Sequence, residues 1–306
     1  MVWWKHGDWQ PEGEEQAMTI WIDPPRWPAH GRLWSHLVSD TSYDELRAFA
    51  ARADLPARGF EGDHFDVPQE RYGALVAAGA CPTEGKELAR VLRDSGLRFQ
   101  KGKGERALAA YRNVLPQLEV GHSLHLVASS RSTPDKLTAA TVVFVTDARG
   151  SQLLVRTVAR DAWGAPGGGR EPGETVLECA TRETWEESGL RIDPVTLRPC
   201  GYERVTIDDG AAGRWPHRRN YVACFTAMLE DVAPPVAPRD LDVDAAQWVG
   251  GPEVERRCGA QFWWPLLASL LESSLESSLE SLSLSPLSAS STLPVTRAGG
   301  PARGRG

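Results

Sequence analysis

A glycine-rich turn followed by closely spaced glutamates, between residues 166 and 190, carries the clearest chemical signal in the sequence. Glu183, Glu186 and Glu187 are spaced i, i+3 and i+4, so a helix would place them on one face. Carboxylates this close repel one another unless a cation or a set of donors neutralises them, and hard oxygen ligands favour Mg²⁺ or Mn²⁺. Glu174 and backbone carbonyls of the turn would complete the shell. A solvated acidic helix face is the other interpretation.

The sequence around these glutamates predicts a helix with defined ends. Thr175 and Glu178 have the spacing of a capping box, which satisfies free N–H groups at a helix start. Gly189 stands where a left-handed residue would end the helix. The helix would rest on a sheet through a more apolar stripe formed by Leu177, Ala180, Thr181 and Thr184.

The segment from residue 168 to residue 190 resembles the Nudix box, G-x5-E-x7-R-E-U-x-E-E-x-G-U, where U is a bulky aliphatic residue. Thr184 departs from the pattern at the first U position, a β-branched residue that could still pack. The resemblance implies an α/β fold, the Nudix α/β/α sandwich with a mixed sheet. The positions in register are Gly168, Glu174, Arg182, Glu183, Glu186, Glu187, Gly189 and Leu190.

The resemblance also implies the activity and the residues that carry it. A Nudix hydrolase cleaves the phosphoric anhydride of a nucleoside diphosphate linked to another group, such as a nucleoside triphosphate, by means of metal-activated water. Mg²⁺ is the implied cofactor, with Mn²⁺ as a substitute, and Arg182 would orient the glutamates through an ion pair. Asp242, in a later acidic loop, is a candidate general base beside the box glutamates themselves. The implied metal ligands are Glu183, Glu186, Glu187, the Gly168 carbonyl and Glu174.

Residues expected to contact the substrate lie in a basic segment between two predicted strands. Such a loop over a metal site can contact an outer phosphate or a sugar, whereas exposure without function is the alternative. Signatures that distinguish Nudix relatives specific for ADP-ribose, NADH, dinucleoside polyphosphates or coenzyme A are not found, so the nucleotide stays open. The candidate substrate-binding residues are Arg214, His217, Arg218 and Arg219.

Two other functions compete with hydrolysis at the box. The Nudix fold could serve as a nucleotide sensor that regulates its neighbour, although no box glutamate has been lost. A third hypothesis makes the N-terminal region a phosphoesterase.

That N-terminal region, residues 18–100, resembles the bacterial domain of unknown function 4031. The resemblance depends on Ile22-Asp23 and on the runs PPRWPAHGR, WSHLVSDT, GDHFDVP and AAGA. We expect a small α/β domain with a first strand near residue 20 and a Pro-rich turn that leads into a short helix. A further strand is expected near GDHFDVP, and helices over residues 42–53, 69–78 and 85–95.

Histidine and aspartate are concentrated in the loops and strand ends of this region. Such a set could bind a divalent metal or act on a phosphate ester, and His36, His64 and Asp66 are the first choices. Structural histidines and capping aspartates are the alternative. Arg26 and Arg32 would suit phosphate oxygens. The full set is Asp23, His30, His36, Asp40, Asp63, His64 and Asp66.

Length and composition set the remaining expectations. A chain of 306 residues favours two domains, and a net charge of −7 does not indicate a nucleic-acid partner. The five cysteines lack CxxC spacing, which argues against structural zinc and disulfides. The absence of a long apolar run and of a signal peptide predicts a cytoplasmic protein without a membrane partner. A homodimer is a further hypothesis.

The expected domain order begins with a disordered extension over residues 1–17 and the small α/β domain over 18–100. A linker follows over 101–120, with a connecting helix over 107–118. The Nudix domain is expected over 121–271, with a closing helix over 253–271 broken near Pro265. A low-complexity tail over 272–306 predicts disorder, with an amphipathic helix against a partner as the alternative. Strands are expected at residues 125–128, 139–146, 152–158, 197–207, 220–229 and 245–249.

Overall fold

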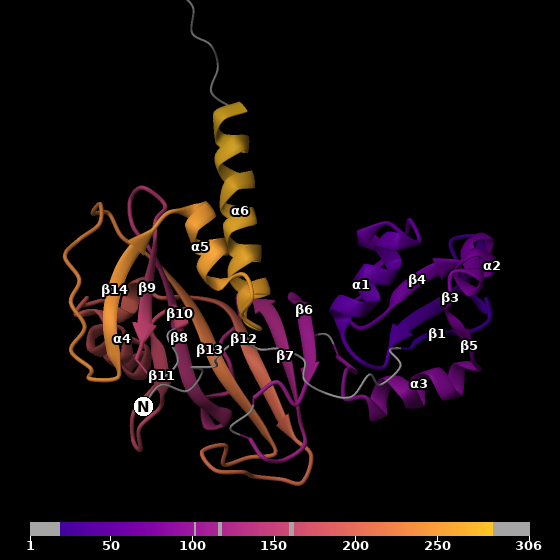
Figure 1. Cartoon of the computed structure of the whole chain (residues 1–306), viewed down its shortest axis with the longest axis horizontal. Helices are drawn as coiled ribbons and strands as arrows, with labels where there is room; N and C mark the ends of the chain where they lie inside the picture. Colours follow the sequence, from indigo (N-terminus) through magenta and orange to yellow (C-terminus); the bar gives the residue numbers. More distant parts are fainter. Residues whose placement is uncertain (1–18, 101, 116–117, 159–161, 284–306) are drawn as a thin grey trace, which may run out of the picture. The chain divides into compact units, whose positions relative to one another are not determined.

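The computed structural model describes residues 19–100, 102–115, 118–158 and 162–283 (Figure 1). The predicted extension over residues 1–17 therefore lies outside the described residues, as does the end of the predicted tail after residue 283. The chain divides after Leu270 into two compact units. Within the described part of the chain, none of the helices has both the length and the apolar composition needed to cross a membrane.

Among the described residues, the N-terminal region forms a sheet of five short strands with three α-helices. The strand order is β2-β3-β1-β5, and β4 pairs with β3. The core contains Ile22, Leu37, Leu46, Val67 and Leu75, all fully buried. The predicted helices are confirmed within a residue of their ends, and Ser42 caps α1 by accepting a hydrogen bond from the Glu45 amide. The elements are β1 (Ile20–Ile22), β2 (Trp27–Ala29), β3 (Arg32–Ser39), α1 (Tyr43–Arg52), β4 (Phe65–Pro68), α2 (Gln69–Ala77), β5 (Cys81–Pro82) and α3 (Gly85–Asp94).

The short helix expected after the Pro-rich turn is wrong, because this segment is the hairpin of β2 and β3. His30 and Gly31 connect the two strands with φ angles of 51° and 73°. Two consecutive positive φ angles are the mark of a type I′ turn, whose twist matches that of paired strands. Along β3, Ser35 and Leu37 are fully buried on one face, which is the period of a strand rather than that of a helix.

Among the described residues, nine strands form the second sheet, in the order β10-β9-β8-β13-β12-β7-β6, with β11 beside β8 and β14 beside β9. The sheet is mixed, since β13 runs parallel to β8 and antiparallel to β12. Each strand predicted for this region is confirmed. The strands are β6 (Glu105–Arg112), β7 (His122–Ser129), β8 (Thr138–Thr146), β9 (Gln152–Thr157), β10 (Ala162–Gly164), β11 (Gly167–Gly169), β12 (Arg198–Ile207), β13 (Arg219–Met228) and β14 (Val243–Val249).

The connecting helix expected over residues 107–118 is wrong, because β6 occupies its first half. Its alanines favour a helix by intrinsic propensity. Pairing with β7 overrides this preference and buries Ala107, Ala109, Ala110 and Tyr111. A register shift between Ala107 and Ala109 bends the strand and disturbs the two-residue period that would have revealed it.

Helices cover both faces of this sheet, which is the expected α/β/α sandwich (Figure 1). On one face, α4 (Val176–Ser188) packs against β8, β11 and β14, and Ala180 shares a core with Val143 and Val145. The neighbouring residue Phe144 points to the other face, where its ring lies 6.4 Å from that of Trp263. The helix α5 (Gly251–Cys258) and the start of α6 (Trp264–Ser283) follow there.

The disordered tail expected from residue 272 is wrong for its first part, because α6 continues to Ser283. Pro265 stands in the first turn of α6, where its missing N–H costs nothing, so the predicted break separates α5 from α6. Leu and Glu of the repeat are good helix formers, and extending an existing helix requires no new nucleation.

Candidate active site

The helix of the box is capped at both ends as predicted. The Thr175 hydroxyl accepts from the Glu178 amide at 3.2 Å, and the Glu178 carboxylate accepts from the Thr175 amide at 2.8 Å. Gly189 ends the helix with a φ of 74°. A side chain at position 189 would also approach the Ala237 carbonyl oxygen at 2.6 Å, so glycine is required there for two reasons.

The glycine strand β11 lies directly against the glutamates of α4. The Glu183 carboxylate occupies the space that a Cβ atom at position 168 would fill. The Gly167 amide donates to Glu187 Oε2 at 3.0 Å, and Glu187 is fully buried. Glycine at these positions therefore allows backbone and carboxylates to meet without an intervening side chain.

One guanidinium holds three carboxylates together. Arg182 Nε donates to Glu174 Oε1 at 2.8 Å, while Nη1 donates to Glu183 Oε1 and Glu186 Oε2, each at 2.9 Å. Its Nη2 donates to the Gly169 carbonyl at 2.8 Å. Arginine's fixed fork of donors suits this multiple contact better than a lysine ammonium would.

Burial and charge act in opposite directions on these carboxyls. Burial raises the pKa of Glu183, which is 5% exposed, and the Arg182 charge works against that rise. For Glu174, burial is also the largest influence, but hydrogen bonds from Arg182 and the Glu171 amide leave its pKa lowered. Buried carboxylates are unfavourable unless a positive group compensates them, and in this structure the guanidinium of Arg182 provides that charge.

The donors gathered here fit a hard divalent cation. They are carboxylate oxygens together with backbone carbonyls of β11, the ligand type that Mg²⁺ and Mn²⁺ prefer. The glycine strand provides close backbone approach without a Cβ atom. Arg182 stands between the glutamates and keeps their oxygens apart. Among the described residues, no three of these carboxylates each bring an oxygen within 4.8 Å of the others. Binding a cation would therefore require the carboxylates to rotate from Arg182 toward it.

The apolar stripe predicted for α4 is wrong in part, since Leu177 is 41% exposed and Cys179 is buried instead. Thr184, which departs from the box pattern, is fully buried, and its hydroxyl donates to the Ala180 carbonyl at 2.7 Å. Burial raises the pKa of the Cys179 thiol to about 12. Cys179 is therefore a neutral packing residue between Thr141 and the Gly168 carbonyl.

The basic loop lies at the same end of the sheet as the glycine strand. His217 Nε2 contacts the Lys136 carbonyl at 3.0 Å, and Arg170 donates to the carbonyl of the adjacent Asp135 at 2.7 Å. Arg170 continues from β11 and was not predicted, since it lies outside the fixed positions of the box. The four predicted substrate-binding residues, Arg214, His217, Arg218 and Arg219, are exposed.

Asp242 is exposed, and its backbone contacts are with Val158 and Asp240 rather than with the box. The loop just before it approaches α4 more closely. The amides of Arg239 and Asp240 donate to the Glu186 carbonyl at 2.8 and 2.9 Å. These residues were missed because backbone contacts of this kind leave no pattern in a sequence.

The predicted His/Asp set of the N-terminal region separates into two groups. Asp40 accepts a hydrogen bond from the Trp21 indole at 2.9 Å, and His30 forms the β2–β3 turn, so both are structural. The remaining members gather around His36 and His64, as described below. Arg26 pairs with Glu84 at 2.8 Å, and the Arg32 guanidinium lies 5.8 Å from the Trp34 ring centre.

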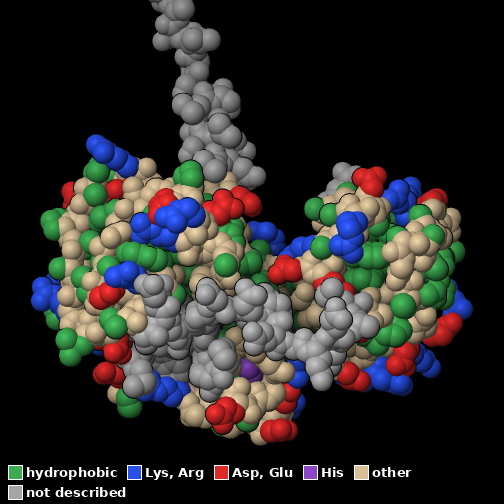
Figure 2. Space-filling view, viewed as in Figure 1, with side chains coloured by type: hydrophobic (Ala, Val, Ile, Leu, Met, Phe, Trp, Pro, Cys, Tyr) green, Lys and Arg blue, Asp and Glu red, His purple; other side chains and the backbone are tan. Residues whose placement is uncertain are grey.

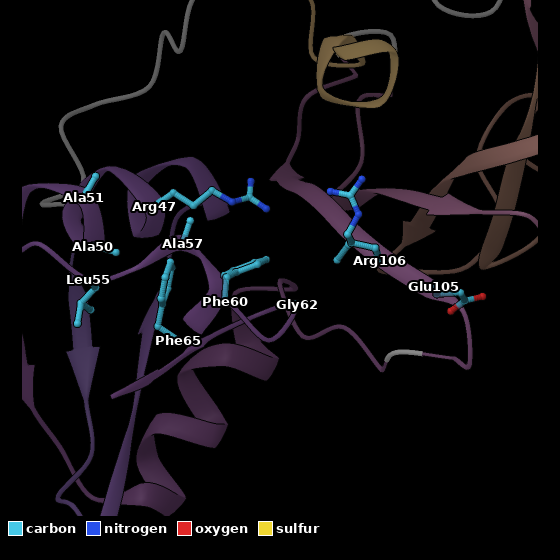
Figure 3. Close-up of a pocket in the computed structure, with 11 residues that line it drawn as sticks. Arg47, Ala50, Ala51, Leu55, Ala57, Phe60, Gly62, Phe65, Glu105 and Arg106 are labelled. Carbon is cyan, nitrogen blue, oxygen red and sulfur yellow. The ribbon is translucent and has the colours of Figure 1, made fainter. Parts of the chain in front are cut away.

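A pocket of about 690 Å³ beside α1 contains none of the predicted site residues (Figure 3). Its lining includes the apolar side chains of Leu55, Phe60 and Phe65. The Arg47 guanidinium lies 4.4 Å from the Phe60 ring centre and donates to the Leu108 carbonyl. On the face drawn in Figure 2, described acidic and basic side chains are interspersed rather than gathered into one basic patch.

Comparison with known proteins agrees with this geometry. The NUDIX domain family matches residues 136–269, and DUF4031, a protein family of unknown function, matches residues 20–95. Phosphatase NudJ from Escherichia coli K12 is 30% identical over 116 residues, which are 37% of this chain and 69% of that protein.

Solved structures of low identity are also similar. The pyrophosphohydrolase BsRppH of Bacillus subtilis is 20% identical, with a TM-score of 0.37, over 50% of this chain and 92% of that one. For the dihydroneopterin triphosphate pyrophosphohydrolase of E. coli the identity is 20% and the TM-score 0.33, over 43% and 94% of the two chains. The match to the family and the identity with NudJ show that the chain belongs to the Nudix hydrolase family.

Proposed function

We propose that the protein hydrolyses the phosphoric anhydride of a nucleoside diphosphate linked to a further group, such as a nucleoside triphosphate. The observation that carries this proposal is the gathering of Glu174, Glu183 and Glu186 around Arg182, against a glycine strand that also holds Glu187. The name of the relative in E. coli, a phosphatase, agrees with chemistry on phosphate groups.

Mg²⁺ is the cofactor we propose, with Mn²⁺ as a substitute. Glu183, Glu186, Glu187, the Gly168 carbonyl and Glu174 would hold it, since all five offer oxygen donors. When bound, such a cation screens the charge of the diphosphate and acidifies a water molecule.

Arg182 has a positioning role in this proposal. Its guanidinium offsets the mutual repulsion of the carboxylates and links three of them to the Gly169 carbonyl. The side chains are thereby kept near one another before substrate arrives, which lowers the cost of assembling the site.

A carboxylate of the site would accept the proton of the attacking water. A box glutamate is favoured over Asp242, because the described contacts of Asp242 are with Val158 and Asp240 and not with the box. Arg214, His217, Arg218 and Arg219 are proposed to contact the outer phosphate or sugar. They are exposed at the end of the sheet where β11 lies.

The test is release of phosphate or pyrophosphate from a panel of nucleoside triphosphates and nucleoside diphosphate derivatives, with Mg²⁺ or Mn²⁺. Glu187→Gln keeps the shape of the side chain and removes its charge. We expect turnover to fall by about 10²- to 10³-fold, the range for losing one preorganised electrostatic group.

Glu178→Gln is the matched control, because Glu178 lies on the same helix, is exposed, and serves only in the capping box, where glutamine also functions. It should retain full turnover. Equal activity of wild type and Glu187→Gln would refute the proposal. Nucleotide binding without turnover in the wild type would favour the sensor instead.

A further inference from the structure

A second group of potential metal ligands lies in the N-terminal region, on strands β3 and β4 and at the residue just before β4. His36, His64 and Asp66 each offer one ligand atom, and these atoms lie within 4.8 Å of one another. The antiparallel register pairs His36 directly with Asp66, and His64 immediately precedes β4. Among the described residues, no other His, Cys, Asp or Glu group meets this distance.

Each imidazole in this group is oriented by a buried aspartate. His36 Nδ1 lies 3.1 Å from Asp23 Oδ2, and His64 Nδ1 lies 2.7 Å from Asp63 Oδ1. The two aspartates are only 2% and 3% exposed. With Nδ1 engaged in both rings, Nε2 is the nitrogen that each ring directs into the ligand group, and His64 Nε2 lies 3.3 Å from Asp66 Oδ1. A bound cation would replace this contact between two of its ligands.

Other bonds fix the two aspartates in turn. Asp23 accepts from the Trp27 indole at 2.9 Å, and Asp63 Oδ2 accepts from the Phe99 amide at 2.8 Å. A carboxylate that holds the far nitrogen of a histidine ring sets its tautomer and orientation, and metal-binding histidines almost always have such a partner. The two aspartate–histidine pairs lie side by side, with the ring centres of His36 and His64 5.1 Å apart, so both rings are oriented toward the same point.

We propose that His36, His64 and Asp66 bind one divalent transition-metal ion, with Asp23 and Asp63 as positioning residues. Imidazole nitrogens favour Zn²⁺, Fe²⁺, Co²⁺ or Ni²⁺, whereas Mg²⁺ prefers oxygen donors. This site therefore differs in chemistry from the glutamate cluster of the box.

The site is of the open kind, which leaves coordination positions for another ligand. Three protein ligands with free positions are typical of catalytic rather than structural metal sites. His36 and Asp66 line a pocket of about 660 Å³ that also contains Trp27, Trp34 and Arg32. The Arg32 guanidinium is about half-exposed, so a small anionic ligand of the metal would find a cation in the same pocket.

The experiment measures Zn²⁺ binding to the full chain after chelation and dialysis, by calorimetry and by metal content. A Glu183→Gln/Glu186→Gln chain serves as the parent, so that the box does not contribute. We expect one Zn²⁺ per chain in this parent. Asp66→Asn, at a partly exposed position, and His64→Gln should each weaken binding at least tenfold, and Asp63→Asn about 10- to 100-fold.

His30→Asn is the matched control. His30 lines the same pocket but is outside the ligand group, and asparagine tolerates its positive φ of 51°. Zn²⁺ binding should be unchanged in this variant. Long-range ¹⁵N spectra of the imidazoles should show the Nε2 resonances of His36 and His64 shifting on Zn²⁺ addition, while their Nδ1–H protons stay in place. Zn²⁺ affinity that survives both His64→Gln and Asp66→Asn, or a parent chain that takes up no Zn²⁺, would overturn the proposal.

Discussion

The two acidic groups of this chain compensate the charge of their carboxylates in different ways. In the box, carboxylates from α4 and from the turn before it share the guanidinium of Arg182, and Glu183 rests against a glycine strand. In the N-terminal region, buried aspartates instead hold two histidine rings, one from β3 and one from the residue just before β4. The first arrangement offers oxygen donors and the second adds nitrogen donors, so the two proposed sites would select different classes of cation. On our proposals, hydrolysis at the box is therefore separate from metal binding at the histidine site.

The largest effect on the box, after loss of a glutamate charge, is expected from Gly168→Ala. The new methyl group would collide with the Glu183 carboxylate and displace it from β11. Turnover should fall about 10²-fold, with a loss of about 1–3 kcal/mol in the free energy of unfolding. Nucleotide hydrolysis and urea unfolding measure the two effects.

Gly251→Ala is the control for that substitution, because a Cβ atom there meets nothing within 4 Å. It should leave both quantities near wild type. Zn²⁺ binding at His36 and His64 should be unaffected by either change. Full turnover of Gly168→Ala would show that close contact between β11 and Glu183 is not needed.

A smaller effect is expected from Arg182→Lys, which keeps the charge but loses the fork that joins three carboxylates. Turnover should fall about tenfold, because a hydrogen bond to a charged group contributes roughly 1.5 kcal/mol at the lower end of its range, and about 1.4 kcal/mol is a tenfold change in rate. Arg191→Lys, an exposed residue over the Trp185 ring, is the control. If lysine at position 182 supports normal kcat and KM, positive charge alone is sufficient and the geometric role is wrong.

No loss of turnover is expected from Glu203→Gln. This substitution tests the effect of burying a carboxyl group that, among the described residues, has no positively charged partner raising or lowering its pKa. Burial alone raises the pKa of Glu203 to about 8, from 4.5. The folded protein thus retains a proton that the unfolded chain loses, and its stability is full below about pH 4.5 and falls as pH rises through about 8. The slope is about 1.4 kcal/mol per pH unit between these limits.

Urea unfolding at several pH values measures this dependence. Glu203→Gln should flatten the profile and should be more stable than wild type at pH 8. If both proteins show the same profile, Glu203 is not the group responsible. Glu174 is the contrasting case: burial acts to raise its pKa, but its ion pair with Arg182 leaves that pKa lowered.

The sequence predicted the parts of the fold that local signals determine. The capping box and Gly189 define α4, and the short, mostly apolar runs of β8 and β13 need no distant partner to be recognised. The hairpin of β2 and β3 was missed because its turn is His30-Gly31 rather than Asn-Gly. The strand β6 was missed because its alanines favour a helix until β7 pairs with them.

The same distinction holds for the sites. The gathering of the box glutamates could be predicted because they lie on one helix and the turn before it, whereas their role in metal binding and catalysis stays a prediction. The group of His36, His64 and Asp66 was proposed from composition, but its geometry depends on the register of β3 with β4. Asp23 and Asp63 could not be recognised as the partners of the two rings, because residue types alone do not show which aspartates are buried beside a histidine.

The central claim is that hydrolysis takes place at the box and not at the histidine site. The most direct measurement is Mg²⁺-dependent turnover of the nucleotide panel by wild type, Glu187→Gln, His64→Gln and the double variant. The account predicts that Glu187→Gln and the double variant lose activity to the same extent, while His64→Gln retains wild-type turnover. Activity that survives Glu187→Gln and is abolished by His64→Gln would contradict it.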